Sequence, residues 1–473
     1  MTGANAGADA GQDPGESTTA DSYRGTPTPS KLTEIARYFL FIGIVGFGGP
    51  LVHIAMMEDD LVGDDSREWT SHSEFMEGLA ICNMLPGPAS TQLGIFMGWA
   101  YAGKLGAVVA GFFFMVPTFV LVVIFSYVYF AYQALPAVEA VFYGINPVVI
   151  GLIVGACYSM AHSAFAEGRA DYELAVGTRT WTIDYLLVAI LVVATAVVAA
   201  FNPNPVVAFV LAGFVAVAVY RSGWVRENVS RVSIGVVVAT AVGALVVFRE
   251  HLIAAVTPSI RRAIEASPLW GYLLTLWANE WVKLFAFMVY TGSFIYGGGL
   301  VLIPFIELYV VREFGWLTGQ EFVDGIAIGQ LSPGPVVMTT AFVGYGFILE
   351  ASGGLVWLAV LGAFVAAVGA FGPSFVFIMG FFPYFAQVRE NDVVQTALVG
   401  VNAAVVGAIL GATVTLALEA FVIEGVVDPI PIALAIGSCL LFVRGLHAAW
   451  IILGGALVGV PLYFLDVLSI LPR

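Results

Sequence analysis

The sequence predicts an all-α polytopic membrane protein built from two homologous, inverted helical repeats with broken helices. Three observations lead to this fold class. The 473 residues are 60% hydrophobic and 11% charged, with a mean hydropathy of +0.93, whereas soluble domains are about 25% charged. Apolar runs of membrane-spanning length recur between short polar loops. Proline–glycine elements interrupt these runs at matching places in the two halves.

The first half begins with an acidic tail, residues 1–31, whose Gly-, Ala-, Asp- and Ser-rich composition predicts disorder. The first repeat then occupies residues 32–221. Its six apolar runs are expected to be membrane crossings, at residues 34–57, 74–101, 105–131, 137–160, 183–201 and 205–220. A linker at 222–279 contains a further short run at 232–248, which adds a crossing if it spans the membrane.

The second repeat, residues 280–473, contains six more runs, at 282–306, 321–347, 355–383, 394–418, 429–443 and 447–466. With the linker run the total is 13 crossings, and the halves are inverted with a cytoplasmic N-terminus. The cytoplasmic loops then hold most of the arginines, as the positive-inside rule requires; they are Arg169, Arg179, Arg221, Arg226, Arg231, Arg312, Arg389 and Arg444. Arg249, Arg261 and Arg262 would lie outside. Parallel halves, without the linker crossing, are the alternative.

Ordered matches between the halves indicate an internal duplication. The elements at 47–50 (FGGP) and 85–88 (LPGP) correspond to those at 296–299 (YGGG) and 332–335 (SPGP). Between them, Ser71-x-x-Glu74 and Thr318-x-x-Glu321 are capping boxes that start the helix before each PGP. Further along, glycines spaced for close helix packing match in pairs, Gly151 and Gly155 with Gly407 and Gly411.

The proline–glycine breaks are candidates for an anion site. Irregular backbone in a membrane is tolerated only inside protein or beside water, and a helix that starts there presents free N–H groups and a positive dipole end. Hydroxyl and amide side chains follow each break and can donate to an oxyanion. The predicted substrate-binding residues are Gly48, Gly49, Pro86, Gly87, Pro88, Ser90, Thr91, Gln92, Gly297, Gly298, Gln330, Pro333, Gly334, Pro335, Thr339 and Thr340. The alternative is that the breaks only kink helices and ease packing.

Four further polar residues are candidates with open alternatives. Asn146 and Asn402 occupy matching mid-span positions and either lie near the substrate or join helices by hydrogen bonds. His53 and Glu58 are candidates for proton coupling. A loop-end or helix-end histidine explains His53 equally well, and a water-facing carboxylate explains Glu58 better. The three cysteines, Cys82, Cys157 and Cys439, are scattered in apolar runs and predict buried hydrophobes rather than a disulfide or metal site.

At these motifs the chain resembles the CHR chromate ion transporter family in its long, two-domain form. The resemblance rests on FGGP followed by Leu51 to Ala55, LPGP followed by Ser90 to Gln92, the glycines before Ile303-Pro304, and Gly329-Gln330 before SPGP. It covers about 32–220 and 280–466. It implies a multi-pass plasma-membrane transporter that exports chromate, coupled to the proton-motive force, with sulfate as a similar competitor. The acidic first loop, the long tail and the long linker depart from the pattern and leave orientation and coupling ion open.

Other functions fit the sequence less well. The net charge of −15, with three lysines, argues against nucleic-acid binding and suits a halophile. The sequence contains no Walker A motif, so ATP coupling is not expected, and no cofactor is predicted. The five histidines are scattered, and neither HExxH nor GxSxG occurs, so we do not expect an enzyme. The main rival is a transporter or channel for sulfate or another small anion on the same scaffold. Protons and membrane lipids are the other expected partners, and a homodimer is left open.

Overall fold

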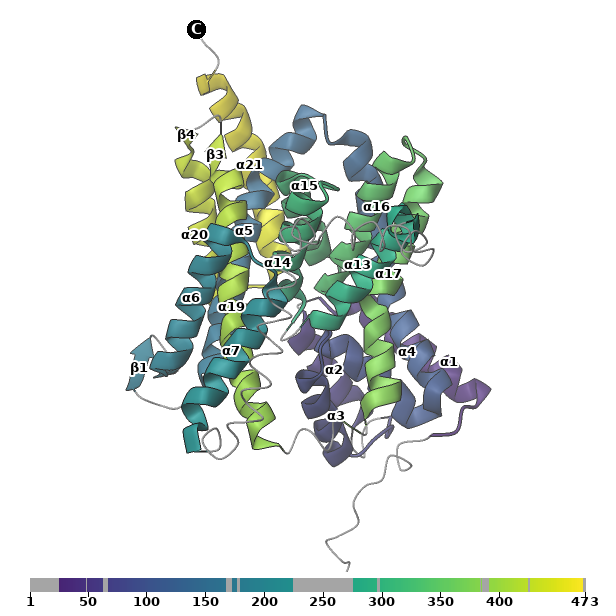
Figure 1. Ribbon diagram of the computed structural model, residues 1–473. Coiled ribbons are helices and arrows are strands. Elements are labelled where there is room, and N and C mark those ends of the chain that lie inside the picture. The colour runs from purple at the N-terminus through teal and green to yellow at the C-terminus, as the bar shows by residue number, and fades with distance from the viewer. Residues whose placement is uncertain are drawn as a thin grey trace, which may run out of the picture.

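A computed structural model describes the chain over residues 25–47, 49–62, 67–166, 172–176, 179–223, 275–295, 298–382, 384, 391–423 and 426–470 (Figure 1). Most of the predicted tail and the linker run at 232–248 lie outside these residues. Helices dominate the described chain, as predicted. Within the described residues, four helical segments are long and apolar enough to cross a membrane: Ala89–Tyr132, Pro136–Ala166, Val356–Phe381 and Asp392–Leu418. They occupy matching places in the two repeats.

The first repeat opens with a helical hairpin whose tip is the FGGP break. Its two arms are α1 (Pro29–Val45) and α2 (Pro50–Leu61). The Tyr38 hydroxyl of α1 donates to the Met56 carbonyl oxygen of α2 at 3.2 Å, and both helices pack against α4. The predicted crossing at 34–57 is therefore two helices separated by the break. A prolyl residue at the first position of each arm supports the start of the helix there.

A second hairpin follows, with the LPGP break as its tip. Its arms are α3 (His72–Met84), which starts with the predicted capping box, and the first part of α4 (Ala89–Tyr132). At the base, Trp69 stacks on Tyr101 with 4.6 Å between ring centroids. Halfway along, Gly78 lies against the Phe96 ring. The prediction of one crossing at 74–101 is therefore wrong, because the chain turns back at the break instead of continuing through it.

The rest of α4 continues as one long apolar helix, which fits the predicted crossing at 105–131. Non-helical backbone at Ala102 and Gly103 separates the hairpin arm from the remaining, straight-through part of the helix. Next come α5 (Pro136–Ala166), the antiparallel strands β1 (Tyr172–Val176) and β2 (Arg179–Ile183), α6 (Tyr185–Phe201) and α7 (Pro205–Tyr220).

The second repeat has the same order of elements. Its first hairpin pairs α13 (Glu280–Phe294) with η1 (Gly299–Val301), α14 (Leu302–Ile306) and the π-helix η2 (Glu307–Glu313). Its second hairpin pairs α15 (Gly319–Leu331), which starts with the predicted capping box, with η3 (Val336–Met338) and α16 (Thr339–Ala351). Trp316 stacks on Phe347 at 4.1 Å at the base of this hairpin, which is the counterpart of the Trp69–Tyr101 stack. The predicted crossing at 321–347 is therefore also a hairpin.

The second repeat ends with α17 (Val356–Val376), the π-helix η4 (Phe377–Phe381), α19 (Asp392–Phe421), the strands β3 (Val422–Ile423) and β4 (Val426–Val427), α20 (Pro429–Val443) and α21 (Ala448–Ile470). The two strand pairs are small additions to the predicted all-α fold. Both follow the long helix of their repeat. Figure 1 places α3 and β1 toward its lower end but α15, β3 and β4 in its upper half.

The two repeats exchange their C-terminal helices. Helix α5 packs against α20 and α21 of the other repeat, and α19 packs against α6 and α7. The glycines predicted to serve packing lie in these contacts. A methyl group on Gly151 would be 2.1 Å from the Ala435 carbonyl oxygen, and one on Gly407 would be 2.5 Å from the Leu191 carbonyl oxygen. Small side chains are therefore required at these contacts.

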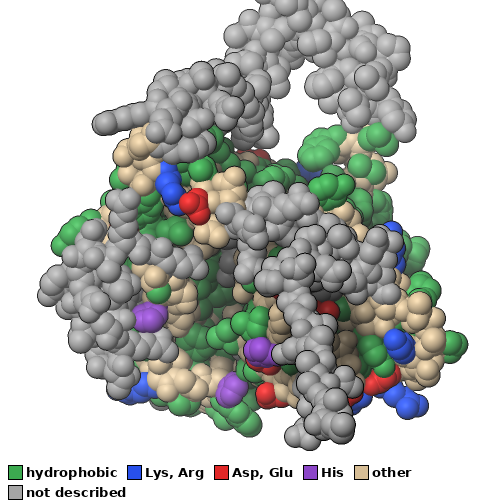
Figure 2. Space-filling view, turned by 90° about the horizontal axis from the view of Figure 1, so that it is seen from below, with side chains coloured by type: hydrophobic (Ala, Val, Ile, Leu, Met, Phe, Trp, Pro, Cys, Tyr) green, Lys and Arg blue, Asp and Glu red, His purple; other side chains and the backbone are tan. Residues whose placement is uncertain are grey.

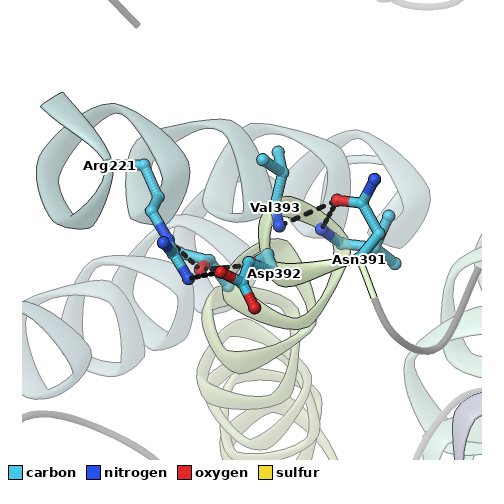
Figure 3. Close-up of polar contacts among 6 residues, drawn as sticks. Arg221, Asn391, Asp392 and Val393 are labelled. Atoms are coloured by element: carbon cyan, nitrogen blue, oxygen red, sulfur yellow. Dashed lines mark hydrogen bonds and ion pairs between the residues drawn. The ribbon is translucent and has the colours of Figure 1, made fainter. Parts of the chain in front are cut away.

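Polar contacts join α7 and α19 at their lower ends. Arg221, just after α7, contacts Asp392 at the start of α19, with 3.0 Å between Nη2 and Oδ2 (Figure 3). The Asn391 side chain caps α19 by accepting the Val393 N–H at 2.9 Å. Seen from this end, most of the visible Lys and Arg side chains lie toward the edge of the face, and hydrophobic side chains lie between them where the surface is visible (Figure 2).

Candidate functional site

The tip of the first LPGP hairpin contains a buried group of polar atoms. Ser90, Thr91 and Gln92 begin the return arm and are at most 1% exposed. Ser90 Oγ, Thr91 Oγ1 and Gln92 Oε1 have no hydrogen-bond partner among the described residues. Buried polar atoms in folded proteins are nearly always paired. Three unpaired atoms in one helical turn therefore indicate a ligand position.

Backbone donors converge on the same turn. Pro88 is the N-cap of α4 and provides no side-chain cap, so the first N–H groups of the helix lack intrahelical partners. Gly87, with φ of +134°, turns the chain so that Pro88 can start the new helix. The Gln92 Nε2 group donates to the Pro86 carbonyl oxygen at 2.6 Å and holds the tip closed. This tip therefore presents N–H and O–H donors at the positive end of a helix dipole.

The second repeat supplies the surroundings of this tip. The Gly87 N–H donates to the Ile295 carbonyl oxygen, at the end of α13, at 2.5 Å. Ser374 of α17 lies so near that a methyl group on Gly87 would be 2.7 Å from its Oγ. Ser374 is fully buried, and its Oγ is also without a partner in the described chain. The tip and Ser374 together form a polar site between the repeats.

The second hairpin tip has the matching arrangement, but its hydroxyl groups already have hydrogen-bond partners in the protein. Thr118, the repeat counterpart of Ser374, donates to the Pro333 carbonyl oxygen at 3.0 Å and lies against Gly334. Thr339 and Thr340 donate to the carbonyl oxygens of Val336 and Val337, each at 2.8 Å. Pro335 is the N-cap here, and Gln330 is half-buried at the end of α15. The structure therefore distinguishes the two tips, which the sequence treated alike.

The glycine pairs shape the backbone before the next helix. Gly49 and Gly298 have φ of +80° and +138° and are the N-caps of α2 and η1. Nothing lies within 4 Å of a methyl group built on either. Their requirement for glycine is therefore conformational. Gly48 and Gly297 lie outside the described residues.

The two coupling candidates differ in environment. His53 is fully buried, its Nε2 lies 2.7 Å from the Gly46 carbonyl oxygen, and its ring meets Phe114 edge-on at 5.0 Å. It is thus held against the end of α1. Glu58 is partly exposed, with its Oε1 3.7 Å from His72 Nδ1.

The two asparagines are not at the tips. Asn146 lines a cavity at the opposite end of α15 from the second tip, together with Asp324 and Tyr129. Asn402 is half-buried in α19. Sequence reasoning did not single out Asp324, Thr118 or Ser374. A repeat match at Pro117-Thr118 and Pro373-Ser374 was the available signal for the last two.

Comparison with known proteins covers both repeats. A family model described as "Chromate transporter" matches residues 33–218 and 282–460. The chain is 30% identical over 458 residues to a "Chromate transport protein" of Cupriavidus metallidurans, covering 95% of this chain and 98% of that protein. It is also 30% identical over 395 residues to a "Chromate transport protein" of Pseudomonas aeruginosa, covering 83% and 82% of the two chains. No solved structure matches significantly.

Proposed function

Because the chain belongs to the chromate transporter family, we propose that it is a secondary transporter that exports chromate or a similar divalent oxyanion across the plasma membrane, coupled to protons. The observation that carries the proposal is the tip of the first LPGP hairpin. There, free N–H groups at the start of α4 lie beside the unpartnered hydroxyl groups of Ser90 and Thr91. Oxyanions accept hydrogen bonds from such donors.

The neutral donors of this site suit a substrate that must be bound and then released. It is built from backbone dipoles and neutral side chains, and no Lys or Arg is among the residues that the structure places at the tip. A buried fixed cation would bind a dianion strongly and slow its release. Neutral donors replace the water lost by the anion and keep binding reversible.

We further propose that the two repeats are inverted in the membrane, with the N-terminus cytoplasmic. This is supported by the opposite positions of β1 and of β3–β4 along the molecule (Figure 1). The exchanged packing of α5 with α20–α21 and of α19 with α6–α7 is the contact pattern that a pseudo-two-fold axis produces. Arg221, assigned to the cytoplasmic side, follows α7 at the lower end.

The difference between the two tips supports alternating access. In this structure the first tip has unpartnered polar atoms, whereas the threonines of the second tip bond to their own backbone. Repeats related by inversion can exchange such conformations, and the exchange opens the site to the other side of the membrane.

The proposal is tested by chromate flux in proteoliposomes that contain the purified full-length chain. Triple substitution of Ser90, Thr91 and Gln92 by Ala is expected to abolish flux. The matched control is substitution of Ser163 by Ala, because its hydroxyl is exposed at the end of α5 and bonds only locally. Unchanged flux in the triple variant would show that the site is elsewhere.

Transport of sulfate or another small anion on the same scaffold is the rival function. Chromate and sulfate have the same charge and tetrahedral shape, so the donors at the tip do not separate them. Competition of chromate uptake by sulfate, molybdate and phosphate measures the preference directly. If sulfate is carried and chromate is neither carried nor inhibitory, the substrate is wrongly assigned although the transporter class stands.

A further inference from the structure

A second polar site lies in a cavity of about 530 Å³ toward the upper end of the molecule. Its walls come from the end of α4, the start of α5, the start of α15, the end of α19, and α21. The carboxylates among the lining residues are Glu139, Glu321 and Asp324, and the lining contains neither Lys nor Arg. A cavity with this charge repels anions and therefore serves something other than the oxyanion.

Asp324 is the buried carboxylate of this cavity. It lies in the second turn of α15 and is 3% exposed. Its Oδ2 accepts a hydrogen bond from the Tyr129 hydroxyl at 2.6 Å, while its Oδ1 has no partner within the described chain. Ionisable side chains inside membrane proteins are costly and usually mark ion or proton pathways. Asp324 therefore lines the cavity and has one carboxylate oxygen without a hydrogen-bond partner among the described residues.

A proton fits this site better than a metal cation. Hard metal ions such as Ca²⁺ and Mg²⁺ gather six or more oxygen ligands, whereas Asp324 accepts a side-chain hydrogen bond from one phenol, that of Tyr129, and Asn146 and Glu321 line the same cavity. Among the residues that the structure describes, no three metal-ligating side chains are grouped together. A single carboxylate with one free oxygen needs only a proton to become neutral.

The position of Asp324 connects the cavity to the second hairpin tip, the repeat counterpart of the proposed oxyanion site. Asp324 and the second tip belong to one helical hairpin, and Pro333 lies nine residues further along, or about 13 Å at the helical rise. We infer that Asp324 is the proton-carrying residue of the transport cycle. This inference rests on the proposed function and deepens it, because it names the group that couples the proton to the hairpin.

In this scheme the carboxylate takes a proton from water in the cavity and releases it to water on the other side after the hairpin has moved. One O–H bond forms and the same bond breaks, so no further reactant is needed. The other titratable groups that line the cavity are Tyr129 of α4, Glu139 and Tyr143 of α5, Glu321 of α15 and Tyr463 of α21. Glu139 accepts from the Tyr463 hydroxyl and Tyr143 donates to Asp428, so both lie in separate pairs.

The test separates proton coupling from chromate translocation in proteoliposomes with the membrane potential clamped at zero. One assay measures exchange of radiolabelled chromate at equal pH on both sides. The other measures chromate accumulation in vesicles with an acid interior. Asp324→Asn is expected to keep exchange and to lose accumulation above equilibrium. Glu321→Gln is the matched control, because it removes a carboxylate from the same cavity while a glutamine keeps the capping box.

Tyr129→Phe provides a second, independent readout. It keeps the carboxylate but removes its 2.6 Å hydrogen bond, so the half-maximal point of gradient-driven accumulation is expected to move to higher pH. Accumulation by Asp324→Asn equal to wild type, a sodium gradient replacing the proton gradient, or an unchanged pH profile in Tyr129→Phe would each overturn the inference. Absence of chromate exchange in the wild-type protein would instead refute the proposed function.

Discussion

Thr91→Val is expected to weaken chromate binding without destabilising the empty protein. Thr91 is fully buried at the tip of the first LPGP hairpin, and its Oγ1 has no partner among the described residues. Valine has the same shape and lacks only the hydroxyl. The substitution therefore removes one donor to the anion and also one unsatisfied polar atom.

The two effects have opposite signs. A hydrogen bond to a charged group contributes about 1.5–3 kcal/mol, so its loss raises the dissociation constant about 10- to 150-fold. A buried hydroxyl without a partner costs about 1–3 kcal/mol in the unliganded state. Its removal therefore leaves the free energy of unfolding unchanged or increases it. Thr340→Val is the contrasting control, because its hydroxyl already donates to Val337 at 2.8 Å and its loss lowers stability by about 1 kcal/mol.

Equilibrium dialysis with radiolabelled chromate and thermal unfolding of the purified protein in detergent measure both quantities. Thr91→Val should bind at least about tenfold more weakly than wild type and unfold at the same or a higher temperature. Thr340→Val should unfold at a lower temperature and bind within about threefold of wild type. Wild-type affinity in Thr91→Val would refute the assignment of this hydroxyl to the anion.

Three further predictions concern the packing and use the same unfolding assay. Gly334→Ala places a methyl group against the Thr118 hydroxyl and should lower the free energy of unfolding by about 1–3 kcal/mol. Adding Thr118→Ala should restore part of this stability, and no recovery would contradict the contact. Gly151→Val should lower the unfolding temperature because the side chain meets the α20 backbone, whereas Gly437→Ala, in open space, should not. Arg221→Ala removes the half-exposed ion pair of Figure 3 and should change stability by less than about 1 kcal/mol, so a larger loss would show that this contact is more than a surface pair.

Much of the fold follows from the sequence because local signals and the duplication agree. Both capping boxes start their helices, and the packing glycines lie in the close helix contacts. The crossings at 74–101 and 321–347 were wrong because hydrophobic length cannot distinguish one long helix from two short antiparallel ones. The stacks of Trp69 on Tyr101 and of Trp316 on Phe347 reveal the return of the chain, and they depend on three-dimensional contact.

The candidate site was predictable only where it is local. Ser90 to Gln92 follow the break in sequence. The unpaired hydroxyls of Ser90 and Thr91 fit the expected anion donors, whereas the unpaired Gln92 Oε1 can only accept. Ser374 belongs to the other repeat and reaches the tip only through the packing of the two halves. No sequence motif includes Asp324, which lies three residues after the capping-box Glu321 in the same helix. The pairing of Tyr129 with Asp324 joins residues 195 positions apart, which no spacing rule anticipates.

The exchange of C-terminal helices has a consequence for biosynthesis. When the first repeat has been made, the glycine face of α5 has no partner, because α20 and α21 are still untranslated. Likewise α6 and α7 lack their partner α19 until it has been translated. The nascent half therefore enters the membrane with incomplete helix contacts, and its packing is completed only by the last residues synthesised. We expect truncation before α20 to leave a chain that is inserted but readily degraded.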